Sequence, residues 1–401
     1  MPDILADSMI VPSHRSGQRT FAIVASVGGL FFAIFLLLHG PAHIRAATLL
    51  SRMQDPQATG LMSKLYADSV DTKLTQISTP TGAIRARLYF PDGKPDAPGL
   101  VVLHGVHHLG IDEPRLVAFA RSLSSSGVKV LTPELTSLAD YKVDPASVDV
   151  IGYSAREFAG QTGRRVGVLG LSFSGGLSLL AAADPHFTQS IAFVVSVGAH
   201  DDLQRVSQYL ITSRINRPDG TTFHLQAHEY GALILIYSHL EDFFPAVDAP
   251  VARDALRTLL WEQVDEARKL SAQLSPESRQ KMDLLFDHHL ESFIPQIETM
   301  IAQHQNEMSA VSPHGQLSSL HVPVLLLHGA ADNVIPPTEL LWLQQDIPQN
   351  DLRGALTSAV LSHLDMQRPP SFKDELALVD FMAQIFELLD REKRVNQNPN
   401  F

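Results

Sequence analysis

Two serines lie where an apolar run of the chain gives way to small residues. Residues 166–176 read VGVLGLSFSGG, in which Ser172 follows the apolar part and Ser174 comes two positions later. A serine hydroxyl is a weak nucleophile, so it must be held exposed, beside a base and near donors for an oxyanion. A sharp turn between a strand and a helix does this, and it needs small residues two positions either side of the serine. Gly170 and Ser174 occupy those positions, which predicts Ser172 as the nucleophile.

Ser174 is a competing nucleophile, because it too has small residues on both sides, Ser172 and Gly176. Placing Ser174 at the turn would lengthen the preceding strand by two residues and leave Gly170 without a role. Ser172 is therefore preferred, with Gly175 in the small-residue start of the helix. A third interpretation is that both serines merely cap a helix after a glycine turn.

An oxyanion formed at Ser172 needs backbone N–H donors, and one of them belongs to the residue after the nucleophile, Phe173. The second donor is expected from the loop that follows the third strand. His104 and Gly105 open that loop and Val106 comes next. Val106 is therefore the predicted second donor.

Three histidines in the same loop, His104, His107 and His108, suggest a metal site at first sight. Adjacent histidines that leave a strand point in different directions, however, and no carboxylate cluster joins them. We therefore expect no metal ion here and no other cofactor.

The acid and the base of such a site follow the serine in the order Ser, Asp, His. Residues 322–327 form an apolar run, and Asp332 lies in the loop after it, where catalytic groups gather in open α/β sheets. His363 is the only histidine downstream of Asp332, so it is the predicted base. Asp201 and Asp202, which follow an earlier strand-like run, are the alternative acids or could line the substrate pocket.

Strand-like and helix-like runs alternate around these residues. A hairpin is predicted at 73–90. Apolar runs of strand length follow at 100–104, 128–132, 166–170 and 191–197. Segments with helical spacing separate them, and this alternation predicts a mostly parallel, doubly wound α/β sheet.

The alternation stops near residue 200 and resumes near residue 322, which indicates an insertion. We divide the chain into a flank at 1–20, an apolar segment at 21–39, a helical connector at 40–71, a first core part at 72–200, a helical cap at 201–320, a second core part at 321–392 and a tail at 393–401. Long helical patterns occupy 252–274 and 278–308. A separate helical domain that binds a partner is the alternative for the insertion.

Large apolar residues near the start of the predicted cap could form a roof over the substrate pocket or the cap's own core. They are Tyr230, Leu233, Leu235, Tyr237, Phe243 and Phe244. A core role is the preferred interpretation for most of them. An apolar roof would favour esters of medium or lipid-like size.

The motifs together resemble the α/β-hydrolase superfamily, in particular its dienelactone-hydrolase and prolyl-oligopeptidase-like esterases. The resemblance covers about residues 72–200 and 320–390. It implies an α/β-hydrolase fold in which Ser172, Asp332 and His363 form a catalytic triad. It also implies that the backbone amides of Val106 and Phe173 form the oxyanion hole. Ser174 departs from the glycine that is usual at its position.

Residues 21–38 read FAIVASVGGLFFAIFLLL, an uncharged stretch close to the length that crosses a bilayer as a helix. We expect a single-pass membrane anchor, with a cleaved signal peptide as the alternative. Basic residues flank the stretch on both sides, so the positive-inside rule does not decide the orientation. A short N-terminal flank slightly favours a catalytic domain outside the cytoplasm.

Composition narrows the function further. The formal net charge of −12 and the lack of clustered Lys and Arg argue against a nucleic-acid partner, and the absence of cysteine excludes thiol chemistry. The expected activity is hydrolysis of a small-molecule or lipid-like carboxylic ester through an acyl-enzyme. A peptidase, a C–C bond hydrolase and a non-catalytic binding protein of the same fold are the alternatives, and the oligomeric state stays open.

Overall fold

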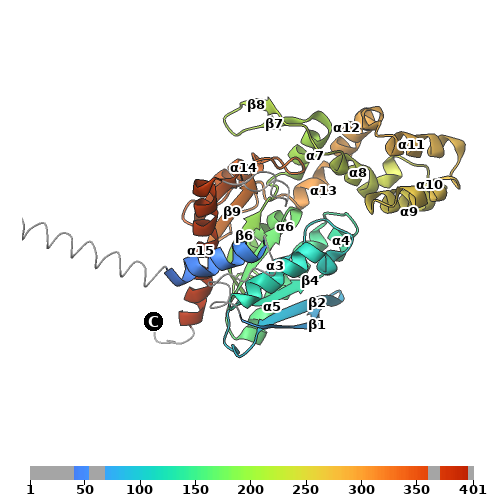
Figure 1. The fold of residues 1–401 in the computed structure, drawn as a ribbon. Helices are drawn as coiled ribbons and strands as arrows, with labels where there is room; N and C mark the ends of the chain where they lie inside the picture. Colours follow the sequence, from blue (N-terminus) through green and yellow to red (C-terminus); the bar gives the residue numbers. More distant parts are fainter. Residues whose placement is uncertain (1–39, 54–67, 360–370, 396–401) are drawn as a thin grey trace, which may run out of the picture.

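A twisted eight-stranded sheet forms the centre of the molecule (Figure 1). The computed structural model describes residues 40–53, 68–359 and 371–395. The strands of the sheet, in chain order, are β1 (Val70–Thr79), β2 (Gly82–Pro91), β3 (Gly99–Leu103), β4 (Lys129–Pro133), β5 (Val166–Leu171), β6 (Ile191–Val197), β9 (Val324–Gly329) and β10 (Leu352–Ser358). Their order across the sheet is β1-β2-β4-β3-β5-β6-β9-β10.

The pairing of the strands confirms the predicted sheet type. β1 and β2 form the antiparallel hairpin, and β2 pairs antiparallel with β4. Every pair from β4 to β10 is parallel. The carboxyl ends of these parallel strands therefore meet at one edge of the sheet, which is where Ser172 and Asp332 follow β5 and β9.

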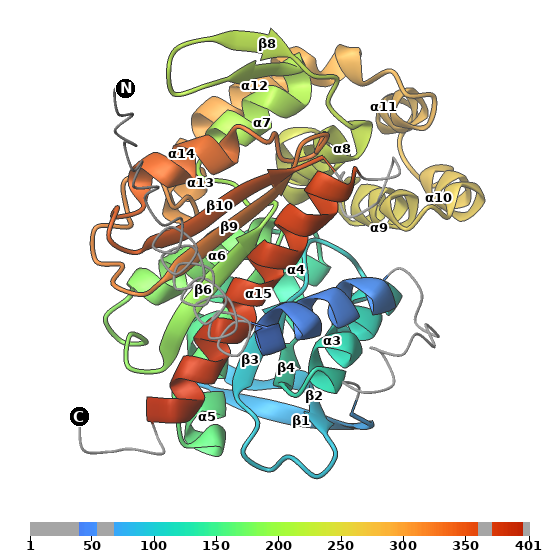
Figure 2. The ribbon, with the colours of Figure 1, turned by 60° about the vertical axis from the view of Figure 1, so that its left-hand side comes forward.

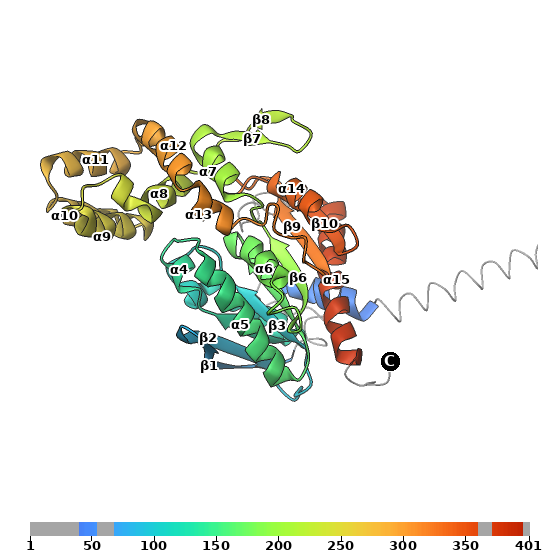
Figure 3. The same ribbon diagram turned by 180° about the vertical axis from the view of Figure 1, so that it is seen from behind.

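Helices cover both faces of the sheet. One face carries α5 (Pro145–Thr162) and α6 (Phe173–Ala183), as Figure 3 shows. The other face carries the helix at 40–53, α3 (Pro114–Ser125) and α15 (Phe372–Val395), which lie side by side in Figure 2. Shorter helices in the core are η1 (Gly110–Asp112), α4 (Thr136–Ala139) and α14 (Glu339–Asp346). Each face thus has its own layer of apolar packing.

Local sequence explains where the long helix α5 begins and ends. The Asp144 carboxylate accepts a hydrogen bond from the Ser147 backbone N–H, which caps the first turn. Pro145 suits the first helical position because it needs no backbone donor there. Gly163 ends the helix in the left-handed conformation, with φ of 68°.

The insertion between β6 and β9 is more varied than a purely helical cap. A small antiparallel hairpin, β7 (Arg214–Asn216) with β8 (Thr222–His224), was not predicted. The remaining elements are α7 (Leu203–Thr212), α8 (Glu229–Ser238), η2 (Leu240–Asp242), α9 (Ala249–Leu260), α10 (Val264–Ser271), α11 (Pro276–Phe286), η3 (Leu290–Phe293), α12 (Ile294–Gln303) and α13 (Gln305–Ala310). The helices predicted at 252–274 and 278–308 are therefore each broken into shorter pieces.

Two segments that we predicted as a connector and a tail contribute to the core or to its last helix. The helix at 40–53, within the predicted connector, buries Ala46 and Leu49 completely against the α15 face of the sheet. α15 continues to Val395, beyond the predicted start of the tail. The apolar segment at 21–39 lies outside the described residues. Within the ranges that the structure describes, no helix has both the length and the apolar character to cross a membrane.

Candidate functional site

Ser172 occupies the predicted turn between β5 and α6. Its backbone has φ of 58° and ψ of −133°, a combination that L-residues rarely adopt. The Ser172 N–H donates to the Val197 carbonyl at 2.7 Å, which ties the turn to the neighbouring strand. Such a conformation costs on the order of 1–3 kcal/mol and persists where the surrounding structure enforces it. The strain presents the side chain at the carboxyl edge of the sheet.

The small residues around Ser172 are required by the close approach of α6 to β5 and to the end of β6. A Cβ atom on Gly170 would lie 2.4 Å from the Ser174 carbonyl oxygen and 2.6 Å from Gly175 Cα. A Cβ atom on Gly175 would lie 2.8 Å from the Ala199 Cβ. Glycine at these two positions therefore follows from packing, as the motif predicts.

Ser174 is buried inside the turn. Its hydroxyl accepts a hydrogen bond from the Leu171 N–H at 2.9 Å and is placed to donate to the Leu171 carbonyl at 2.8 Å. Ser174 is 0 % exposed, whereas Ser172 lines two pockets. The Ser174 hydroxyl thus stabilises the turn, which explains how this chain accommodates serine where glycine is usual.

We predict that Ser174→Ala keeps hydrolytic activity within about tenfold of wild type but lowers the free energy of unfolding. The substitution leaves the Leu171 N–H without its acceptor, and a buried unsatisfied donor costs about 1–3 kcal/mol. Urea denaturation measures the stability change. Loss of activity in a fully folded Ser174→Ala protein would instead assign the chemistry to Ser174.

The loop between β3 and α3 passes directly over the serine. A Cβ atom on Gly105 would lie 3.0 Å from Ser172 Cβ and 3.7 Å from its Oγ. Val106, the next residue, lines a pocket together with Ser172. Phe173 is the first residue of α6, where a backbone N–H has no acceptor within the helix. The two predicted oxyanion donors thus belong to the two backbone segments that border Ser172.

His104 holds this loop in place. Its Nε2 accepts from the Leu135 N–H at 2.9 Å, and its Nδ1 lies 2.7 Å from the Gly105 carbonyl, which it reaches as a donor. Burial lowers the pKa of His104, so the ring is neutral and keeps both hydrogen bonds. His104 is therefore a support of the loop rather than a group that reaches substrate.

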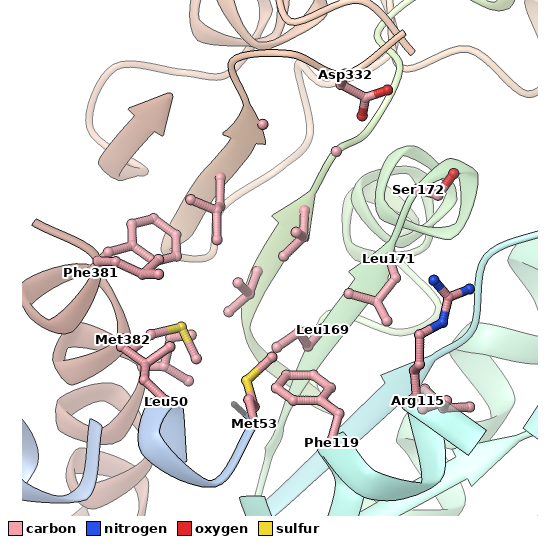
Figure 4. A pocket seen from close by; sticks show the side chains of 18 of the residues that line it. Leu50, Met53, Arg115, Phe119, Leu169, Leu171, Ser172, Asp332, Phe381 and Met382 are labelled. Carbon is pink, nitrogen blue, oxygen red and sulfur yellow. The ribbon is translucent and has the colours of Figure 1, made fainter. Parts of the chain in front are cut away.

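Asp332 lies in the loop after β9 and is 2 % exposed. Its Oδ1 accepts from the backbone N–H groups of Val334 and Ile335, both at 3.0 Å. His328 Nε2 lies 3.0 Å from the Ile335 carbonyl and is placed to donate to it, which fixes the same loop. Asp332 and Ser172 line one pocket (Figure 4). The structure therefore brings together the predicted nucleophile and the preferred acid.

The alternative acids are engaged elsewhere. Asp201 Oδ2 accepts from Arg205 at 2.8 Å, and burial raises the pKa of Asp201 to about 7. Asp202 caps α7 by accepting from the Arg205 N–H at 3.0 Å. The backbone N–H groups of both residues donate to the Glu339 carboxylate. Neither aspartate lines the two pockets that contain Ser172, so this cluster joins the start of the insertion to α14.

His363, the predicted base, lies outside the described residues. The structure accordingly places the predicted nucleophile, the preferred acid and the loop with the predicted second oxyanion donor, and the position of the base stays a prediction from chain order.

Ser172 lines a polar cleft between the sheet and the insertion. This cleft has a volume of about 610 Å³ and includes Val106, His107, His108, Tyr141, Tyr230 and Trp261. Burial lowers the pKa of His107 and His108 and raises the pKa of Tyr230 to about 12, so these side chains are neutral at physiological pH. Sequence reasoning missed Tyr141 and Trp261, which have no motif around them.

The insertion does not place most of the large apolar side chains near its start over the substrate pocket. Leu235, Tyr237, Phe243 and Phe244 are buried in the apolar core, as the preferred interpretation held. Leu233 is partly buried against the same core, and Tyr230 alone of the six lines the cleft. The apolar pocket at Ser172 lies instead on the opposite side, beneath the carboxyl edge of the sheet (Figure 4).

Two groups of side chains in the described part of the chain have donor atoms close enough to hold a metal ion. They are His239 with His304 and Glu307, and Asp201 with His314 and Asp346. Neither group contains a residue that lines the two Ser172 pockets. They therefore have no part in the chemistry at Ser172.

Three structural features decide the fold: the strand order, the strained serine between β5 and α6, and the β3–α3 loop over that serine. The chain has an α/β-hydrolase-like fold. No protein-family model and no curated protein matches the sequence.

Several solved structures resemble the chain distantly. A puromycin hydrolase is 15% identical with a TM-score of 0.46, and the match covers 80% of this chain but only 39% of the hydrolase. A hyperthermophilic esterase from Pyrobaculum calidifontis is 15% identical with a TM-score of 0.44, covering 89% and 91%. The acylaminoacyl peptidase of Pyrococcus horikoshii is 13% identical with a TM-score of 0.44, covering 83% and 43%. At this distance they assign no activity to the α/β-hydrolase-like chain.

Proposed function

We propose that this chain is a serine hydrolase that cleaves carboxylic esters through an acyl-enzyme at Ser172. The observation that carries the proposal is the strained Ser172 turn, which holds a hydroxyl between two pockets and directly under the β3–α3 loop. Strain of this kind is retained where function needs it. Two pockets that meet at one nucleophile suit a substrate with a group on each side of the scissile bond.

In the proposed mechanism, His363 removes the Ser172 proton as the hydroxyl oxygen attacks the ester carbonyl. The backbone N–H groups of Val106 and Phe173 stabilise the oxyanion, and Asp332 stabilises the imidazolium. The proton then passes from His363 to the leaving alcohol. Water, activated by the same histidine, hydrolyses the acyl-enzyme and restores Ser172.

A fluorophosphonate probe tests this proposal on the folded full-length protein. We expect one probe per chain, located at Ser172 by peptide mass spectrometry, together with turnover of p-nitrophenyl esters. A folded wild-type protein that takes up no probe would instead be a non-catalytic member of the fold. Labelling at Ser172 with turnover of aminoacyl anilides but not esters would favour a peptidase.

We further propose that residues 21–38 anchor the enzyme to a membrane, with the catalytic domain outside the cytoplasm. The support is the uncharged sequence of this stretch and its position directly before the helix at 40–53, which packs into the core. We expect the chain to remain with membranes during alkaline carbonate extraction, and expect deletion of 1–39 to release it. Extraction of the intact chain by carbonate, or a mature chain beginning after residue 38, would contradict the anchor.

A further inference from the structure

An apolar cavity of about 170 Å³ opens at Ser172 and runs beneath the carboxyl edge of the sheet (Figure 4). Its ceiling is one face of the sheet, because residues two apart on a strand point to the same side. Leu169 and Leu171 come from β5, and Val195 and Val197 from β6. The opposite wall comes from three helices that are far apart in the sequence. It consists of Leu50 and Met53 from the helix at 40–53, Leu116 and Phe119 from α3, and Leu378, Phe381, Met382 and Ile385 from α15.

Polarity changes along the length of this cavity. Ser172 and Asp332 lie at one end in Figure 4, and Leu50, Met53 and Met382 lie at the other. Glu113 and Arg115 are the remaining described polar side chains of the lining. They pair with each other at 2.8 Å beside the opening, where they also line the polar cleft. The reacting end is thus polar, and the described residues that line the interior offer aliphatic, aromatic and thioether groups.

An apolar cavity of this size in a packed layer suggests a binding site for an apolar group. Protein interiors are packed about as densely as organic crystals, and voids larger than a water molecule are few. An apolar cavity of about 150 Å³ stays dry and takes up a benzene-sized molecule. This cavity is slightly larger and is connected to the nucleophile, so it fits an apolar chain of about six to eight carbon atoms that begins at the Ser172 carbonyl.

The cleft on the other side of Ser172 suits a different group. Among the described residues that line it, Arg115 is the one permanent cation and pairs with Glu113, while Glu262 adds a second carboxylate. Burial lowers the pKa of His107 and His108, so both are neutral, and Tyr141 and Trp261 offer polar groups on aromatic rings. Two carboxylates and one guanidinium disfavour an anion, and the polar groups of the lining suit a polar group better than a second apolar chain.

We propose that the cavity under the sheet is the acyl-binding site and that the cleft receives the alcohol part of the ester. The substrates are then esters of medium-length apolar acids with polar alcohols that carry no negative charge. This inference rests on the proposed ester hydrolysis at Ser172. Its distinctive element is that the helix at 40–53 and α15, rather than the insertion, set the length of the acyl chain.

The test compares p-nitrophenyl acetate, butyrate, hexanoate, octanoate and dodecanoate on the full-length chain, with rates divided by active sites titrated with the fluorophosphonate probe. Each methylene that enters an apolar site gains roughly fourfold in kcat/KM. We expect a rise on the order of 100-fold from acetate to hexanoate, and a fall before dodecanoate. A flat profile would overturn the inference.

Two substitutions in the cavity wall should move this optimum in opposite directions. Leu50→Trp fills the cavity and shifts the optimum toward butyrate, whereas Phe119→Ala enlarges it and shifts the optimum toward longer chains. Leu74→Trp, at an exposed position on β1, is the matched control and leaves the profile in place. Because each rate is divided by the concentration of titrated active sites, partial unfolding of a variant does not produce an apparent change in its acyl-chain optimum.

Trp261→Ala in the cleft distinguishes the two sides of the site. We expect it to change the preference among alcohols while the acyl profile stays unchanged. An acyl profile that moves with Trp261→Ala and not with Leu50→Trp would place the acyl chain in the cleft and refute the inference. Absence of labelling at Ser172 would refute the proposed hydrolase itself, so the two failures are distinguishable.

Discussion

We expect Ser172→Ala to lower kcat for p-nitrophenyl esters by roughly 10⁶-fold, because Ser172 is the only serine or threonine among the described residues that line the two pockets. Ser174, the nearest alternative, is buried and hydrogen-bonded within the turn. The measurement is steady-state hydrolysis together with loss of fluorophosphonate labelling. Retention of more than about one per cent of the wild-type rate would mean that the nucleophile lies elsewhere.

The strain at Ser172 supplies a control for this experiment. Ser172→Ala keeps a Cβ atom at φ of 58° and should unfold at nearly the same denaturant concentration as wild type. Ser172→Gly removes the steric conflict, since glycine adopts positive φ readily, and should raise the free energy of unfolding by about 1 kcal/mol. A Ser172→Gly protein that is more stable than the Ser172→Ala protein would show that the conformation of Ser172 costs folding free energy.

The turn could be predicted from sequence because its requirements are local. Gly170, Ser172 and Gly175 lie within six positions, and glycine at 170 is required by backbone atoms of Ser174 and Gly175. The sheet was predictable for a related reason. Its strands are short apolar runs, and their alternation with helices leaves few arrangements besides a parallel doubly wound sheet.

The apolar cavity could not be predicted, because its walls come from segments more than 300 positions apart. Leu50, Phe119 and Phe381 each have the pattern of an ordinary apolar helix face. Only the packing of three helices on one face of the sheet leaves space between them at the Ser172 end. The sequence also gives no sign that 40–53 belongs to the core, since it follows directly on a stretch that fits a membrane span.

The insertion was harder to predict than the core because helical spacing does not show where a helix stops. Residues 278–308 have continuous helical spacing, yet the chain turns at His288, a residue with φ of 62°, and again at His304. Asp201 was a reasonable alternative acid because it comes shortly after a sheet strand. Arg205 and Glu339, which engage it, come from two elements that are brought together only by the fold.

Asp332→Asn tests which aspartate orients the base, and we expect kcat to fall by about 10⁴-fold. The amide keeps an oxygen that can accept from the Val334 and Ile335 N–H groups, so the loop conformation is retained. What the substitution removes is the negative charge that stabilises an imidazolium in the transition state. Ester hydrolysis at several pH values, with circular dichroism to show that the variant is folded, measures the effect.

Asp201→Asn and Asp202→Asn are the matched controls, because they make the same chemical change at the two alternative acids. Both carboxylates act in the Arg205 and Glu339 cluster outside the Ser172 pockets, so we expect kcat to change by less than about tenfold. A large loss of kcat in either control, together with little effect of Asp332→Asn, would mean that the catalytic acid is one of the two aspartates after β6. With the base at His363, the expected pattern requires that the loops after β9 and β10, which are adjacent parallel strands, meet above Ser172.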